Sequence, residues 1–166
     1  MLITFDLDDT LICWQPAIPK EHITLPWYLW WFKYEPLRKG TIHTFTTLRA
    51  EGWKIGIYTT SNRSEHYIER LFKIHGLKLD LIVNQYHHEK IIKKHRIPDK
   101  PSKFPCSVGS YLHVDDSLGV QMEGEKHLFR VLVIDPLDQY WSEKILEEAR
   151  KVAEIVRKNS YEVVAA

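Results

Sequence analysis

The 166-residue chain is predicted to form a three-layer α/β domain, with helices on both faces of a doubly wound, mostly parallel β-sheet. Short apolar stretches alternate with stretches of helical spacing, an order that is typical of parallel sheets. Polar residues suited to chemistry follow three of the apolar stretches, and ligand sites in such sheets lie beyond the carboxyl ends of the strands. The length suits a single domain covering residues 1–166.

Strands and helices are predicted to alternate along the chain. Short, largely apolar strands are predicted at 2–5, 53–58, 79–83, 111–114 and 129–134. Helices are predicted at 41–50, 63–75 and 142–158, with a shorter helix-like stretch at 91–95. Gly52 and Gly76 follow the first two helices, where a left-handed residue is favoured. The last helix has one apolar face, formed by Ile145, Leu146, Ala149, Val152, Ala153 and Val156.

The composition is that of an ordinary globular protein, with 44% hydrophobic and 27% charged residues. A net charge of +1 predicts no general attraction to nucleic acid or to membranes. No apolar run approaches the ~20 residues of a membrane span, and the N-terminus lacks the regions of a signal peptide. Cys13 and Cys106 form neither a metal-ligand spacing nor a disulfide framework. We therefore expect a cytoplasmic protein.

An acidic run directly follows the first predicted strand. It contains Asp6, Asp8 and Asp9, and carboxylates at the end of a buried strand are costly unless something pairs with them. A bound cation is the favoured partner, and oxygen ligands suit a hard ion such as Mg²⁺. The alternative for this run alone is an Asp-rich turn that caps the next element.

Two further strands also end in polar residues. Thr59, Thr60, Ser61 and Asn62 follow the second strand, and Asp115 with Asp116 follows the fourth. A doubly wound sheet would bring these strand ends to the same edge as Asp6. Three polar strand ends are harder to explain as isolated turns than one.

These residues resemble the motifs of the haloacid dehalogenase-like (HAD) superfamily of phosphotransferases. The run Asp6-Leu7-Asp8-Asp9-Thr10 resembles the first motif, DxDxT. Thr59 is similar to the second motif, and Asp115-Asp116 to the acidic fourth motif. The resemblance spans residues 2 to about 136 and implies a Rossmann-like HAD fold.

The resemblance implies a role for each matching residue. Asp6 would attack phosphorus as the nucleophile, and Asp8 would act as general acid and then base while its carbonyl binds Mg²⁺. Asp6 and Asp116 would supply carboxylates to the metal, Asp115 would be a further ligand or an acid that supports the ligands, and Thr59 would bind the phosphoryl oxygens. Thr60, Ser61 and Asn62 are expected to contact substrate, whereas Asp9 is expected to take no part.

The lysine of the third motif has three candidates. Lys100 and Lys103 are favoured because prolines around them could fix a loop near the site. Lys90 has a separation from Asp116 that is more typical of the family. The chain also departs from the common fourth motif, because Gly119 and Val120 stand where many members have a further acid. Asp115 is the expected substitute.

Residues 12–40 are predicted to form a flap rather than a cap domain, since about thirty residues are too few for a full cap. Six aromatic residues lie between positions 27 and 34, and Trp14 precedes them. They could form a platform over the site or an interface, but packing onto the sheet is favoured for most of them. An open site of this kind could accept a macromolecular substrate.

A basic run between positions 90 and 103 contains six Lys or Arg residues and one Asp. It could guide an anionic substrate such as nucleic acid, but a solvated helix face is the favoured interpretation. His87, His88 and His95 lack a further ligand at suitable spacing and are expected to lie on the surface.

The function predicted from the sequence is that of a Mg²⁺-dependent phosphatase acting on a phosphomonoester through an aspartyl-phosphate. Its partner would be a phosphorylated substrate of unknown size, and the oligomeric state is left open. One alternative is a HAD-like binding or scaffold protein with an idle site. A dehalogenase is disfavoured because a halide leaving group does not need the proton that Asp8 would supply.

Overall fold

The computed structural model describes residues 1–23, 27, 34–97 and 99–164, and its centre is a five-stranded sheet. The strands lie in the order β3-β2-β1-β4-β5, and every pair is parallel. They are β1 (Leu2–Phe5), β2 (Lys54–Tyr58), β3 (Leu81–Val83), β4 (Ser110–Asp115) and β5 (Val131–Val133). The predicted α/β class with a doubly wound parallel sheet is confirmed.

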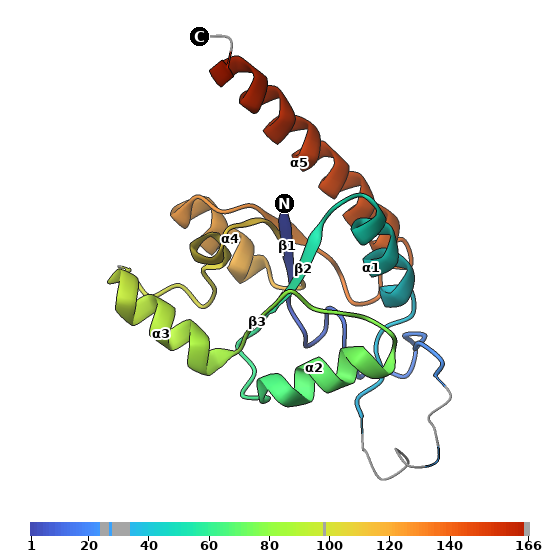
Figure 1. Ribbon diagram of the computed structural model, residues 1–166. Coiled ribbons are helices and arrows are strands. Elements are labelled where there is room, and N and C mark those ends of the chain that lie inside the picture. Colours follow the sequence, from blue (N-terminus) through green and yellow to red (C-terminus); the bar gives the residue numbers. More distant parts are fainter. Residues whose placement is uncertain (24–26, 28–33, 98, 165–166) are drawn as a thin grey trace.

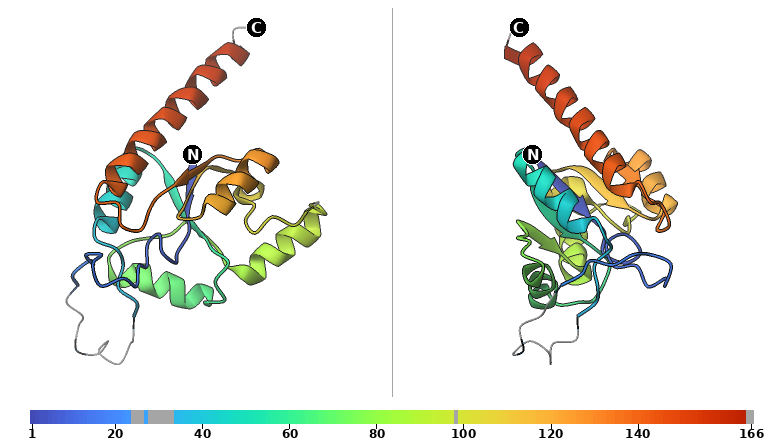
Figure 2. Two further views of the ribbon diagram at one scale, coloured as in Figure 1. Left: turned by 180° about the vertical axis from the view of Figure 1, so that it is seen from behind. Right: turned by 90° about the vertical axis from the view of Figure 1, so that its right-hand side faces the viewer.

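Helices lie on both sides of this sheet, with α1 and α5 on one side and α3 and α4 on the other (Figure 1). Their bounds are α1 (Thr41–Ala50), α2 (Glu65–Ile74), α3 (Gln85–His95), α4 (Leu118–His127) and α5 (Trp141–Val164), with a 3₁₀ turn η2 (Pro105–Val108). The predicted helix at 142–158 is longer in the structure, and the C-terminal part of α5 projects beyond the sheet (Figure 2). No helix in the described ranges is long and apolar enough to cross a membrane.

Two helices were not fully predicted from the sequence: α4 was missed entirely, and α3 was missed over its first six residues. Helix α4 has no continuous apolar face, and only Val120 and Gly124 on it are buried. A Cβ atom at Gly124 would lie 2.6 Å from the carbonyl oxygen of Phe129, so glycine allows the helix to pack directly against the chain entering β5. Helix α4 thus packs through this close backbone contact rather than through an apolar face, which is the feature that sequence periodicity detects.

The segment that leaves the acidic run returns to the body of the protein before α1. Glu21 accepts hydrogen bonds from the backbone N–H groups of Gly40 and Ile42, which tie this segment to the start of α1. Of the aromatic cluster, Trp27 is exposed and Tyr34 packs against the core. Tyr28, Trp30, Trp31 and Phe32 lie outside the described residues.

Candidate active site

Three carboxylates meet at the carboxyl edge of the sheet. Asp6 directly follows β1, Asp115 ends β4 and Asp116 follows it. The Asp6 N–H donates to the carbonyl of Val114 at 2.8 Å, which continues the parallel pairing of the two strands to this point. One oxygen from each of the three acids lies within 4.8 Å of the others. The register of β1 and β4 therefore builds the cluster.

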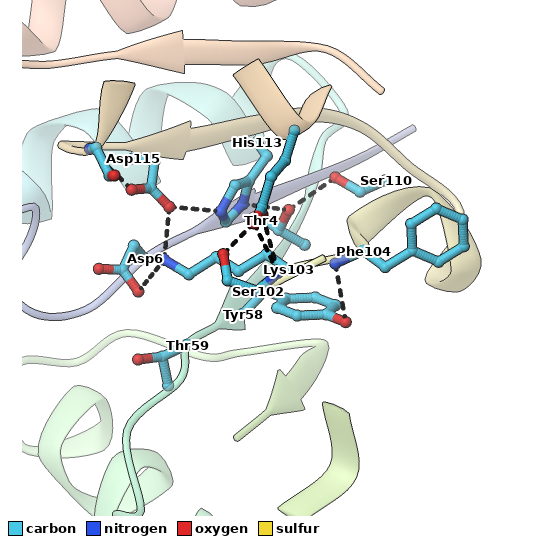
Figure 3. Close-up of polar contacts among 12 residues, drawn as sticks. Thr4, Asp6, Tyr58, Thr59, Ser102, Lys103, Phe104, Ser110, His113 and Asp115 are labelled. Carbon is cyan, nitrogen blue, oxygen red and sulfur yellow. Dashed lines mark hydrogen bonds and ion pairs between the residues drawn. The ribbon is translucent and has the colours of Figure 1, made fainter. Parts of the chain in front are cut away.

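Lys103 is the lysine that lies against these acids (Figure 3). Its Nζ is 2.7 Å from Asp6 Oδ1 and 2.5 Å from Asp115 Oδ2, and the residue is only 4% exposed. Lys100 is exposed and lines a groove beside α3, and Lys90 is exposed with its Nζ over the Tyr86 ring. Of the two favoured lysines, the structure brings only Lys103 to the carboxylates.

The loop that carries Lys103 is fixed on both sides. Before it, the Ser102 N–H and hydroxyl both donate to the carboxylate of Glu123 on α4, the hydroxyl at 2.7 Å. After it, the Phe104 N–H donates to the Tyr58 hydroxyl at 3.2 Å. These anchors hold the ammonium group at the site without any regular secondary structure in the loop.

A buried histidine lies beneath Asp115. His113 Nε2 is 2.9 Å from Asp115 Oδ2, and because a carboxylate only accepts, this nitrogen must carry the hydrogen. The other ring nitrogen, Nδ1, is 3.0 Å from the Thr4 hydroxyl, which is 2.8 Å from the hydroxyl of Ser110. The chain of contacts fixes the ring and aims Asp115 Oδ2 at Lys103.

The cluster separates the pKa values of its carboxyl groups. Burial alone would raise the pKa of Asp115, but the hydrogen bond from His113 and the charge on Lys103 lower it to about 2. Burial raises the pKa of Asp6; Lys103 opposes this shift and Asp115 adds to it. Burial also raises the pKa of Asp116 to about 6, with Asp115 and Asp6 contributing. For Lys103, burial lowers the pKa, but Asp6 and Asp115 outweigh it and the net shift is upward.

These carboxylates fit a hard divalent cation. They offer only oxygen atoms, from three side chains that converge, which is the donor type that Mg²⁺ selects. Two of the three carboxyl groups have raised pKa values, chiefly through burial and also through neighbouring acids, so the single lysine does not offset the cost of charging them. A cation held by Asp6, Asp115 and Asp116 would supply the missing positive charge.

The upward shift at Asp116 predicts how pH controls metal binding. The pKa of about 6 exceeds the value of about 4 in an unfolded chain, so the metal-free fold loses stability from this group as pH rises between those values. Mg²⁺ must displace the proton to bind. We expect added Mg²⁺ to raise Tm more at about pH 7 than at about pH 5.

Thermal melts with and without Mg²⁺ at the two pH values check this prediction. Asp116→Asn is the matched variant, and it should reduce the pH dependence of the Mg²⁺ effect to the part that Asp6 contributes. An equal Mg²⁺ shift at both pH values in the unaltered protein would contradict the assignment of Asp116.

The residues after β2 take different positions around the cluster. Thr59 is buried, and its hydroxyl accepts a hydrogen bond from the Ser61 N–H at 3.1 Å. Figure 3 shows its side chain on the Asp6 side of Lys103. Thr60 and Asn62 are exposed, whereas the Ser61 hydroxyl accepts a hydrogen bond from Arg63 at 2.8 Å.

Asp8 is held by an arginine that the sequence did not single out. Arg63 donates two parallel hydrogen bonds to the Asp8 carboxylate, at 2.8 and 2.9 Å. The same guanidinium bonds both oxygens of Glu35 at 2.6 Å, and the Tyr67 hydroxyl donates to Glu35 at 3.0 Å. The hydrogen bond to Glu35 is the largest cause of a raised pKa at Arg63. Asp8 is thereby linked to the segment that precedes α1.

Of the residues that sequence reasoning missed, only His113 had a usable signal. It lies two positions before Asp115 on a strand, so strand alternation places both on one face. Arg63, Glu35 and Glu123 carried no such signal, since each reaches its partner only through tertiary structure. The surface prediction for His88 is wrong: the residue is 6% exposed, and its Nδ1 is 3.0 Å from the Tyr58 hydroxyl.

The fold and site together define an α/β protein with an acidic centre at the carboxyl edge of its parallel sheet. No protein-family model matches the chain, and no curated protein matches it. A solved structure described as a predicted HAD-like family hydrolase from Porphyromonas gingivalis is similar, with a TM-score of 0.50 and 12% identity. The match covers 90% of this chain and 97% of that one. At this identity the likeness concerns the fold.

Proposed function

We propose that this protein is a HAD-like hydrolase, and specifically a Mg²⁺-dependent phosphatase that acts through an aspartyl-phosphate on Asp6. The observation that carries the proposal is Lys103, buried between Asp6 and Asp115 at 2.7 and 2.5 Å. A buried cation between two acids at the end of parallel strands suits the stabilisation of a transferring phosphoryl group. The similar fold of a predicted HAD-like hydrolase agrees with it.

The first step transfers the phosphoryl group to Asp6. Within the described residues, Lys103 contacts Oδ1 of Asp6. The other oxygen of this carboxylate, Oδ2, is therefore the one proposed to attack. Oδ2 bonds to phosphorus as the bond from phosphorus to the leaving oxygen breaks, and Asp8 gives its proton to that oxygen. Lys103 and the Thr59 hydroxyl bind the oxygens of the phosphoryl group in this proposal.

The second step releases inorganic phosphate. Asp8, now a carboxylate, removes a proton from a water molecule as that water attacks the phosphorus of the aspartyl-phosphate. The bond to Asp6 breaks and its carboxylate is restored. Mg²⁺, when held by Asp6, Asp115, Asp116 and the Asp8 carbonyl, would lower the repulsion between the nucleophile and the phosphate. His113 acts only through Asp115, by holding its carboxylate in place.

The chain is proposed to work as one domain with residues 12–40 as a flap beside the site. The contact of Glu35 with Arg63 supports this arrangement, because it joins the flap to the residue that holds Asp8. A flap of this length leaves the site open to substrates larger than a metabolite.

Hydrolysis of an aryl phosphate tests the proposed function. We expect release of the phenol in the presence of Mg²⁺, its loss on chelation and its return when Mg²⁺ is restored. Acid-quenched protein should carry one phosphoryl group that hydroxylamine removes, since acyl phosphates react with it. A protein that binds Mg²⁺ but hydrolyses no phosphomonoester would instead be an idle member of this fold.

Arg63 is expected to act as a positioning residue for Asp8. Arg63→Lys keeps the charge but cannot make two parallel bonds, and we expect kcat to fall by about tenfold, the equivalent of one hydrogen bond. The loss should be larger for an alkyl phosphate than for an aryl phosphate with a good leaving group, because only the former depends strongly on the proton from Asp8.

Steady-state kinetics on the two substrates provide the measurement. Arg157→Lys, at an exposed position on α5, is the matched control and should leave both rates unchanged. Equal losses on the two substrates would show that Arg63 does not work through Asp8.

A further inference from the structure

A groove lies beside the proposed active site, between α3 and the loop that leads to Lys103. Its volume is about 880 Å³, within the range of ligand sites. Thr60 and Ser102 line it, and each is the chain neighbour of a site residue, Thr59 and Lys103. The groove therefore lies next to the two loops that carry Thr59 and Lys103, and it extends along α3.

Four cations line this groove: Lys90, Lys93, Arg96 and Lys100. The one acid in its lining is Glu89, and that carboxylate already accepts a hydrogen bond from Gln85 at 2.9 Å. Within the described residues, Lys93, Arg96 and Lys100 form no ion pair. By contrast, Lys126 and Lys151 on other surfaces are paired with acids at 2.7 Å. The groove thus carries positive charge that the described part of the protein does not neutralise.

The cations form a row rather than a single point. Lys90 and Lys93 lie on α3, where three residues advance by about 4.5 Å, and Arg96 is the residue that follows the helix, three positions further on. Phosphates along one nucleic-acid strand repeat on a comparable scale, about 3.4 Å of axial rise in a duplex and more when the strand is extended. A phosphopeptide has no such repeat. The row matches a chain of phosphates better than one isolated anion.

An exposed aromatic ring completes the groove. Tyr86 is 60% exposed and lines the same cavity, with Lys90 Nζ 4.0 Å from its ring centroid. A ring beside a row of cations is the combination that binds single strands, because bases stack on the ring while the cations contact the backbone.

We infer that the groove binds a single-stranded nucleic acid whose terminal phosphate enters the site at Asp6. This inference rests on the proposed phosphatase function and names its substrate class. The terminal phosphate is the group that is hydrolysed, by the steps given above, while the following phosphodiesters lie along Lys100, Arg96 and Lys93. Their bonds stay intact.

The test compares two double charge reversals. Lys93→Glu with Arg96→Glu alters the groove, and Lys73→Glu with Arg157→Glu changes the net charge equally at exposed positions outside its lining. The substrates are a short single-stranded oligonucleotide with a 5′- or 3′-phosphate, the matching mononucleotide, a phosphopeptide and an aryl phosphate. Binding of a fluorescent phosphorylated oligonucleotide is measured separately by anisotropy on the Asp6→Asn protein, which removes turnover.

We expect kcat/KM to be higher for the oligonucleotide than for the mononucleotide or phosphopeptide, mainly through KM. The groove reversal should raise that KM by at least about tenfold and leave aryl phosphate turnover unchanged, while the control reversal changes neither. The slope of log affinity against log salt should become about 1.4 units shallower when two phosphate contacts are lost.

The outcomes separate the two proposals. The inference is overturned if the groove reversal weakens oligonucleotide binding no more than the control reversal does. A preference for the phosphopeptide over the oligonucleotide would also overturn it. If the aryl phosphate is not hydrolysed but the oligonucleotide still binds through the groove, the phosphatase proposal fails and the binding site stands.

Discussion

Asp6→Asn is expected to lower turnover of an aryl phosphate by at least about 10⁴-fold, because an amide oxygen is a poor nucleophile and cannot form the aspartyl-phosphate. The buried carboxylate is next to Lys103 at 2.7 Å, and asparagine has nearly the same shape, so the fold should persist. Loss of activity with little loss of structure is the expected signature. Initial rates together with acid-quenched mass spectrometry provide the measurement.

Asp9→Asn is the matched control for this variant. Asp9 has a φ of +55°, a left-handed conformation that asparagine accepts well, and the substitution makes the same chemical change three residues away. Its rate should stay within about twofold of the unaltered protein, the scale of an ordinary surface substitution. Undiminished turnover in Asp6→Asn would end the proposed mechanism.

Lys103→Met is expected to impair both activity and stability. Methionine keeps the length of the side chain but leaves the Asp6 and Asp115 carboxylates facing each other, with no cation between them. Breaking a buried ion pair in this way costs about 3–5 kcal/mol of unfolding free energy in the metal-free protein. Loss of one preorganised charge from the site should reduce kcat by about 10²–10³-fold.

The pH dependence of the lost stability follows from the acids that remain. Without Lys103, the pKa of Asp6, already raised by burial, rises further, so the folded variant binds this proton more tightly than its unfolded chain, while His113 still lowers the pKa of Asp115. Its stability should therefore recover as pH falls and decrease as pH rises through the pKa of Asp6. Mg²⁺ should also restore part of the stability, because it supplies positive charge to the same oxygens.

Denaturant unfolding at several pH values, with and without Mg²⁺, measures these effects. Lys100→Met removes an exposed lysine and is the matched control, expected to change unfolding free energy by less than about 0.5 kcal/mol. It also separates the two lysines that the sequence favoured. Larger losses of aryl phosphate turnover in Lys100→Met than in Lys103→Met would reverse the assignment.

Local patterns were sufficient to predict most of the framework. The strands were predicted from short, largely apolar runs, and the helix at 41–50 was predicted with its observed bounds. Helix α2 was recognised from its apolar spacing, and the structure adds the cap at Ser64, whose hydroxyl accepts a hydrogen bond from the Tyr67 N–H. Helix α4 was missed because its packing depends on glycine at a close contact rather than on an apolar stripe.

The candidate site was also predictable only in part from local sequence patterns. The acids of its centre were predictable because they follow strands, and parallel strands bring their carboxyl ends to one edge. The third-motif lysine was left open among Lys90, Lys100 and Lys103, with the last two favoured, because the loop between α3 and β4 has no periodicity from which a side-chain direction could be derived. Hydrogen bonds to Glu123 and Tyr58, distant in sequence, aim Lys103 at Asp6.

The sequence by itself determined the fold class and the strand ends at which carboxylates and a hydroxyl gather, because hydrophobic periodicity and the alternation of elements along the chain are local properties. Tertiary structure decided which lysine pairs with Asp6, that Arg63 holds Asp8, that His113 supports Asp115, and that the basic run lines a groove beside the site. Each of these depends on contacts between residues far apart in the chain. Such contacts exist only after the elements have packed against one another.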